Sequence, residues 1–131
     1  MDRVKKMVHY WCDDIKKAGL TGKGVTVAVL DTGLAPHPDF KSRVVGWRDC
    51  IYRKEKCYDD NGHGTHVAGI LGGSGQMSGG ILSGIASLCR FVIVKVLDQK
   101  GEANVASILA GLKWVEMNHR KYKIRIVNLS A

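Results

Sequence analysis

The sequence predicts an α/β fold in which a mostly parallel sheet is flanked by helices. Four short runs of β-branched and other apolar residues are typical of buried strands. Stretches with helical periodicity separate these runs, and strands joined in this way pair in parallel through right-handed crossovers. A chain of 131 residues is long enough for one domain with its own core.

The first half of the chain supplies one predicted helix and two strands. Apolar residues on one face of residues 8–18 indicate an amphipathic helix. A buried strand follows over 25–30, and the acid Asp31 stands at its carboxyl end. A shorter strand covers 44–47, and a polar, charged excursion over 48–59 should lie on the surface.

The second half alternates helix and strand, with a glycine-rich loop over 72–80 near its start. That loop lacks the Lys-Ser/Thr of a phosphate-binding loop, so we expect a flexible connection. A helix is predicted over 65–71, a strand over 91–97 and another strand over 124–129. Between the two strands, Asn104 or Ser107 can cap a helix that runs to about His119.

A histidine-containing loop, residues 60–69, is the first candidate for chemistry. Turn and cap residues 60–62 precede His63, which should lie in the first turn of a helix beside unpaired backbone N–H groups. That position favours the neutral imidazole that a general base needs. Glycines on both sides of His63 would allow another backbone to approach closely, and His66 would be a buried structural histidine. The alternative is an ordinary surface histidine at a helix N-terminus.

Asp31 is the second candidate, because ligands and chemistry gather at the carboxyl ends of strands in open α/β sheets. Its carboxylate could hold the distal nitrogen of His63 and fix the tautomer of the ring. The alternative is that Asp31 caps a turn with Thr32 and Gly33.

The two motifs VAVLDTG (27–33) and NGHGTHVAG (61–69) together resemble the subtilisin-like serine protease family, closest to its intracellular type. Stretches 37–39, 84–86, 94–97 and 127–130 are also similar to it. The resemblance implies a subtilisin-like fold, with residues 1–22 as an N-terminal helix and lead-in and 23–131 as part of the catalytic core. It also implies that Asp31 and His63 are the aspartate and histidine of a catalytic triad.

The resemblance further implies residues that bind an extended peptide substrate. The family pairs its substrate backbone with edges that match 101–103 and the end of this chain. For the apolar members of the set, core packing is the alternative. The implied substrate-binding residues are Asn61, Leu97, Gly101, Glu102, Ala103, Val105, Ile108, Ser130 and Ala131.

The nucleophilic serine and the oxyanion-hole asparagine of the family lie beyond residue 131 by this match. None of Ser74, Ser78, Ser83, Ser87, Ser107 and Ser130 stands in the nucleophile motif. We therefore expect a serine endopeptidase whose C-terminal portion is a second chain. Self-cleavage near residue 131 would separate the two portions, and the alternative is that the end at residue 131 has another origin. This chain alone should be inactive. The alternative is an inactive subtilisin-like pseudoprotease that serves as a binding module.

Composition constrains partners and location. The formal charge is +8, but the basic residues form no single stripe and no nucleic-acid motif accompanies them, which argues against nucleic acid. No signal peptide or membrane span is apparent, so a cytoplasmic enzyme is expected.

No cofactor or metal is predicted. Asp39 matches a calcium-binding position of the family, but the loop over 72–80 lacks asparagine and acids, so Asp39 should cap or pair with Arg43. Free thiols are expected, although Cys50 and Cys57 could close a small loop under oxidation, and Cys89 should be buried.

Overall fold

A computed structural model of the protein describes residues 2–7 and 18–130. Its α/β architecture confirms the predicted fold class. Short 3-10 turns at Pro38–Phe40 and Gln76–Ser78 accompany the main elements. These elements are α1 (Asp2–Met7), β1 (Thr26–Asp31), β2 (Val44–Asp49), α3 (His63–Gly72), β3 (Arg90–Lys95), α4 (Val105–Tyr122) and β4 (Ile124–Leu129).

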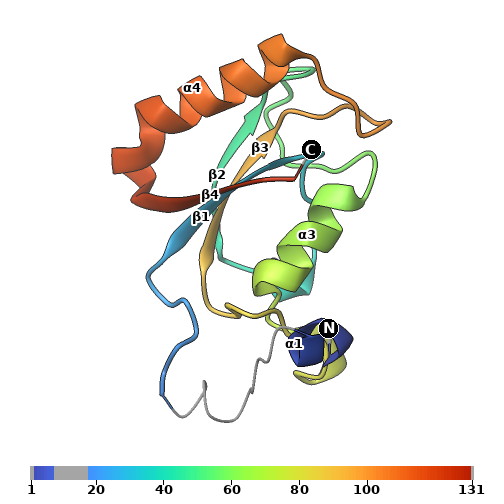
Figure 1. The fold of residues 1–131 in the computed structure, drawn as a ribbon, viewed down its shortest axis with the longest axis vertical. Helices are drawn as coiled ribbons and strands as arrows, with labels where there is room; N and C mark the ends of the chain where they lie inside the picture. Colours follow the sequence, from blue (N-terminus) through green and yellow to red (C-terminus); the bar gives the residue numbers. More distant parts are fainter. Residues whose placement is uncertain (1, 8–17, 131) are drawn as a thin grey trace.

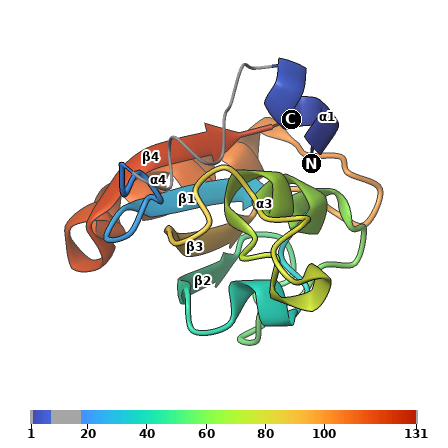
Figure 2. The same ribbon diagram turned by 90° about the horizontal axis from the view of Figure 1, so that it is seen from below.

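The four strands form one parallel sheet in the order β2-β3-β1-β4. Helix α4 covers one face of this sheet and α3 covers the other, so the chain folds in three layers (Figures 1 and 2). β1 pairs with β3 in a register that sets Asp31 beside Lys95. The carboxyl ends of β1 and β3 therefore meet at one edge of the sheet, where the loops to α3 and α4 also begin.

Alternation along the central strands builds two cores. Val27 and Val29 of β1 pack with Ala68 of α3, whereas Ala28 and Leu30 pack toward α4. Every residue of β1 is buried, as a strand covered on both faces requires. Full burial of one such side chain contributes roughly 1.5–3 kcal/mol, so β1 and the similarly buried β3 hold the centre of the sheet firmly.

β4 lies at an edge of the sheet, and its bounds match the predicted strand. Its only strand neighbour among the described residues is β1. Ile126 and Val127 remain 52% and 45% exposed there. Edge strands with exposed apolar side chains invite pairing with a further strand. A later segment that covers this edge remains a prediction.

Two elements, β2 and α4, extend further than predicted because local hydrogen bonds continue past the predicted ends. β2 runs to Asp49, two residues further than predicted, because Asp49 still pairs with Lys95 of β3. α4 runs to Tyr122, where Lys123, with a φ of 54°, ends it. Asn104 is confirmed as the cap of α4, because its Oδ1 accepts a hydrogen bond from Ser107 N at 2.8 Å.

The N-terminal helix of the prediction, residues 8–18, lies almost wholly outside the described residues. The described helix α1 precedes it and was not predicted. Lys5 of α1 is buried, and its Nζ donates to Ser83 Oγ at 3.3 Å. This bond ties the start of the chain to the loop that follows α3.

Candidate active site

Asp31 is held rigidly at the end of β1. Its side chain is 1% exposed, and its Oδ1 accepts a hydrogen bond from Thr32 N at 2.7 Å. Its carbonyl accepts from Val96 N and Leu97 N, the first residues after β3. Its Oδ2 is buried without a hydrogen-bond partner among the described residues. The carboxylate is thus fixed in position by its burial and by the backbone bonds around it.

His63 begins α3, and the structure brings it directly to Asp31. Its Nδ1 lies 2.8 Å from Asp31 Oδ1. The imidazole is 49% exposed, whereas the carboxylate behind it is buried. When Asp31 is ionised it can only accept, so Nδ1 carries the proton and Nε2 keeps a free lone pair. A ring held in this tautomer presents a base on its exposed side.

The N-terminus of α3 differs from the prediction of unpaired amides beside His63. Each of its first four backbone N–H groups has a partner, which joins the helix to the Asp31 segment and to its own loop. The bonds are His63 N to Asn61 Oδ1, Gly64 N to Thr32 Oγ1, Thr65 N to Asp59 Oδ2 and His66 N to Gly62 O. These bonds also explain why α3 begins at His63 and not at Thr65.

Two glycines let α3 approach the strand that carries Asp31. A Cβ at Gly64 would lie 2.3 Å from Gly33 O, and a Cβ at Gly33 would lie 1.9 Å from Tyr58 O. Gly33 also has a φ of 126°, which other residues rarely adopt. The expected close approach beside His63 is therefore confirmed at Gly64. At Gly62 the space is open, and a φ of 106° is what favours glycine.

Asp59 organises the loop before His63, and sequence reasoning missed it. Cap residues were expected only at 60–62, but Asp60 points to Lys95 instead. The Asp59 carboxylate accepts five hydrogen bonds, from Thr32 Oγ1, Asn61 N, Gly62 N, Thr65 N and Thr65 Oγ1. Burial raises the pKa of Asp59, but these bonds outweigh burial and lower it to about 2.

The depressed pKa of Asp59 predicts a loss of stability in acid. Its pKa in the folded state, about 2, lies below the ordinary value of 3.8 that applies on unfolding. Its contribution is therefore present above about pH 4 and is lost as the pH falls toward 2. We expect the melting temperature of the wild type to exceed that of Asp59→Asn most at pH 5–6, and the gap to shrink toward pH 2. A gap that does not change with pH would contradict this assignment.

The prediction that His66 is buried is wrong. His66 is exposed, because α3 turns Gly64, Ala68 and Gly72 toward the sheet. Those positions recur every four residues, and residue 66 lies midway between two of them on the solvent side. His66 therefore provides no support behind His63.

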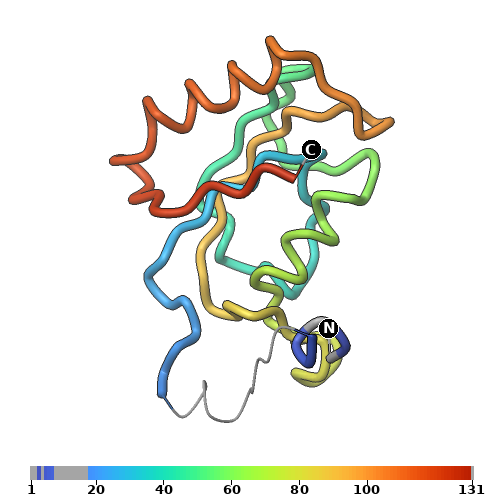
Figure 3. Tube along the Cα trace, in the orientation of Figure 1, coloured from blue at the N-terminus to red at the C-terminus, as the bar shows by residue number. Residues whose placement is uncertain are grey.

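Asn61 joins the histidine loop to the turn that follows β3. Its Nδ2 donates to Gln99 O at 3.0 Å while its Oδ1 accepts from His63 N. The two loops run side by side in the Cα trace (Figure 3). The exposed segment of Gly101, Glu102 and Ala103 comes directly after this turn. The structure thus places this predicted substrate edge beside the loop that carries His63.

The remaining predicted substrate residues are more dispersed. Leu97 is buried in the core under α4, and Ile108 packs against the same core. Val105 is 73% exposed, so core packing does not explain it. Ser130 Oγ donates to Asn128 Oδ1 at 2.7 Å. Ala131 lies outside the described residues.

The cysteines of the described residues are free thiols. Cys50 and Cys57 do not form the disulfide that was considered for oxidising conditions. Cys57 Sγ donates to Leu34 O at 3.3 Å, and burial raises the pKa of this thiol to about 11. Cys89 is fully buried, as predicted. These thiols therefore have a packing role.

Asp39 caps as expected but bonds to Arg43 differently. Asp39 Oδ1 accepts from Met77 N at 3.0 Å, whereas the Arg43 guanidinium donates to the Asp39 carbonyl. Within residues 2–7 and 18–130, no cluster of three His, Cys, Asp or Glu side chains is arranged to hold a metal ion. No helix in these ranges combines the length and apolarity that a membrane span requires.

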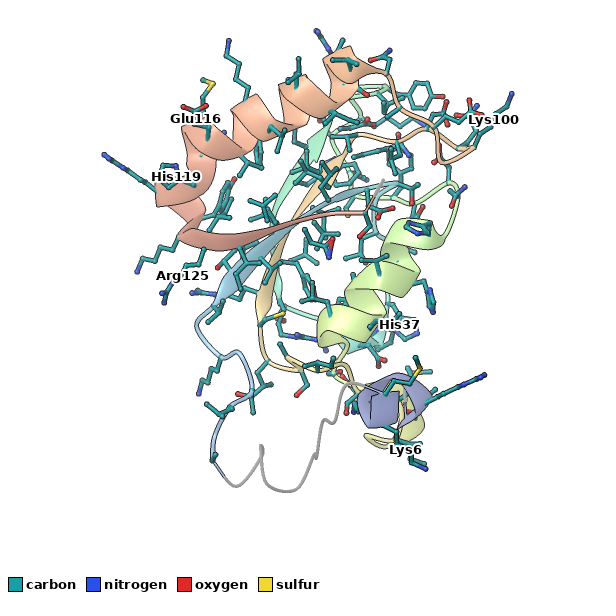
Figure 4. All side chains as sticks on the ribbon, in the orientation of Figure 1. Lys6, His37, Lys100, Glu116, His119 and Arg125 are labelled. Atoms are coloured by element: carbon teal, nitrogen blue, oxygen red, sulfur yellow. The ribbon has the colours of Figure 1, made fainter. Side chains whose placement is uncertain are left out.

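Basic side chains lie apart on the surface. Figure 4 shows Lys6, Lys100 and Arg125 pointing outward from separate parts of the molecule. These three side chains therefore do not share one face of the described residues, and the expectation that the protein does not bind nucleic acid stays a prediction.

Comparisons with known proteins show the family of this chain. A family model described as Peptidase S8, the subtilase family, matches residues 22–131. Serine protease AprX of Bacillus subtilis is 50% identical over 95 residues, which is 72% of this chain and 22% of AprX. Minor extracellular protease Epr of the same organism is 41% identical over 114 residues, 87% of this chain and 16% of Epr.

A solved structure is also similar. The crystal structure of a cold adapted subtilisin-like serine proteinase superposes with a TM-score of 0.66 at 37% identity, covering 75% of this chain and 34% of that chain. The present chain therefore spans only about a fifth of AprX and about a third of that proteinase.

Proposed function

Because this chain belongs to the subtilase family, we propose that it supplies the aspartate and the histidine of an Asp-His-Ser triad in a serine endopeptidase. One observation carries the proposal. The buried carboxylate of Asp31 lies 2.8 Å from Nδ1 of the half-exposed His63. In an ordinary surface ion pair both side chains are exposed. Here the carboxylate is buried and the imidazole is half-exposed, which is the arrangement expected of an acid that orients a catalytic histidine.

In this proposal, His63 Nε2 takes the proton from a serine hydroxyl as the serine attacks the peptide carbonyl. The same nitrogen then gives the proton to the leaving amine. Asp31 holds the ring and stabilises the imidazolium that forms between these steps. The proposal assigns the nucleophilic serine and the oxyanion-hole donor to a segment outside residues 1–131, as the resemblance to the family implies.

The proposed substrate is a peptide in an extended conformation. Residues Gly101, Glu102 and Ala103 are exposed and lack strand neighbours in the described sheet. Gly101 N, Glu102 N and Glu102 O are already hydrogen-bonded to Asp98. A substrate strand would therefore pair with the other backbone groups of this segment, and its side chains would alternate toward and away from the enzyme. Asn61 and Gln99 fix the distance between this edge and the catalytic base.

A serine-directed phosphonate tests the proposal on the full-length protein. We expect covalent labelling of one serine, located by peptide mass spectrometry outside residues 1–131, together with loss of peptide hydrolysis. Labelling should fall when a peptide substrate competes. An intact protein that neither reacts with the phosphonate nor cleaves peptides would contradict the proposal and favour a binding role.

A further inference from the structure

Lys95 is a fully buried lysine at the carboxyl end of β3. Its side chain is 0% exposed. Its Nζ donates to Thr32 O at 2.6 Å and to Asp60 Oδ1 at 2.7 Å. The same ammonium lies 5.2 Å from the ring centroid of Tyr58. Two chain segments, the one that follows Asp31 and the loop that contains Tyr58 and Asp60, therefore converge on one positive charge.

The ring that covers this ammonium is itself fixed. Tyr58 OH donates to Asp49 Oδ2 at 2.6 Å, and Asp49 is 1% exposed. Burial and the bond to Asp49 raise the pKa of Tyr58 above its ordinary value, so its hydroxyl stays a donor. The ring thus forms a stable wall that keeps water from the ammonium.

Stability alone is a weak reason for this arrangement. Removing an ammonium from water costs several kcal/mol, and a buried ion pair is often no more stabilising than apolar residues of similar volume. The two acceptors, however, lie next to the candidate catalytic residues in the sequence. Thr32 directly follows Asp31, and Asp60 lies three residues before His63. Lys95 links the segment that carries the acid to the loop that carries the base.

We propose that Lys95 is a positioning residue that holds Asp31 and His63 in register with each other. The inference rests on the proposed function of this pair. The ammonium fixes the Thr32 carbonyl on one side and the histidine loop on the other. A shift of about 1 Å in a catalytic group can cost about 100-fold in rate. Loss of this link should therefore lower turnover while substrate binding stays nearly unchanged.

Three variants of the full-length protein separate positioning from mere stability. Lys95→Met keeps the length of the side chain but removes the donor, and it leaves Asp60 without its partner. Lys95→Met with Asp60→Asn removes both charges, so no buried charge is left unpaired. Asp60→Asn alone keeps Lys95 and an acceptor oxygen. Lys113→Met on the exposed face of α4 is the matched control.

We expect kcat, normalised to the sites that a burst titrant counts, to fall about 10- to 100-fold in both variants that carry Lys95→Met. KM should stay within about twofold, because the substrate edge is untouched. Asp60→Asn should lower kcat less than the loss of Lys95 does, because Lys95 still holds the Thr32 carbonyl and asparagine keeps an acceptor oxygen. Lys113→Met should keep kcat within about threefold. An unchanged kcat in the double variant, with only a changed melting temperature, would overturn the inference. A wild type that the phosphonate does not label would instead refute the proposed function.

Discussion

The His63→Ala variant of the full-length protein should hydrolyse peptides about 10⁴- to 10⁶-fold more slowly than the wild type. This range is the one known for loss of the catalytic histidine in subtilisin and other serine proteases. The loss follows from geometry. His63 is the only described side chain that bonds to Asp31 Oδ1, and its ring is exposed toward solvent. Without it, the proposed mechanism lacks the base that takes the serine proton. Steady-state kcat and KM on a peptide substrate provide the measurement, and KM should change little.

His66→Ala is the matched control for this experiment. His66 lies on the same helix, but it is exposed and faces away from the sheet. Its removal should leave kcat within about threefold of the wild type, as surface substitutions usually do. If His63→Ala retained more than about a tenth of wild-type kcat, His63 would not be the base.

The sequence allowed the fold class and the central pair to be predicted because both depend on local patterns. An apolar run that ends in Asp31 indicates a strand whose acid lies at the carboxyl edge. Glycines around His63 indicate a turn into a helix. Each motif alone left an ordinary structural alternative, and the resemblance of the two motifs together to the subtilisin-like family is what made the pair specific. The structure places His63 Nδ1 2.8 Å from Asp31 Oδ1.

The supporting residues could not be predicted in the same way. Asp59 and Asp60 are adjacent acids with the same local chemistry, yet one caps α3 and the other binds Lys95. The choice depends on where Thr65 and Lys95 lie in three dimensions, which short-range spacing does not encode. Helical periodicity likewise allowed either face for His66, and only the packing of Gly64 against the Asp31 strand decided it.

Asp31→Asn should lower kcat about 10³- to 10⁴-fold with little change in fold. A single oxygen, Oδ1, accepts from both Thr32 N and His63 Nδ1. The amide oxygen of asparagine can take this place, so the geometry of the ring is retained. The buried negative charge is lost, however, and the imidazolium that forms during the reaction loses its counter-ion. The expected loss is therefore mainly electrostatic, and it should appear in kcat and not in KM.

The amide nitrogen of this variant would occupy the position of Oδ2, which has no partner among the described residues. An unsatisfied buried donor costs about 1–3 kcal/mol, so the melting temperature should fall by several degrees while the fold persists. Phosphonate labelling should slow by about the same factor as kcat, because both reactions need the activated serine. Glu116→Gln on the exposed surface of α4 is the control for loss of one negative charge, and it should match the wild type. An Asp31→Asn protein with kcat within tenfold of the wild type would show that the carboxylate charge does not assist His63.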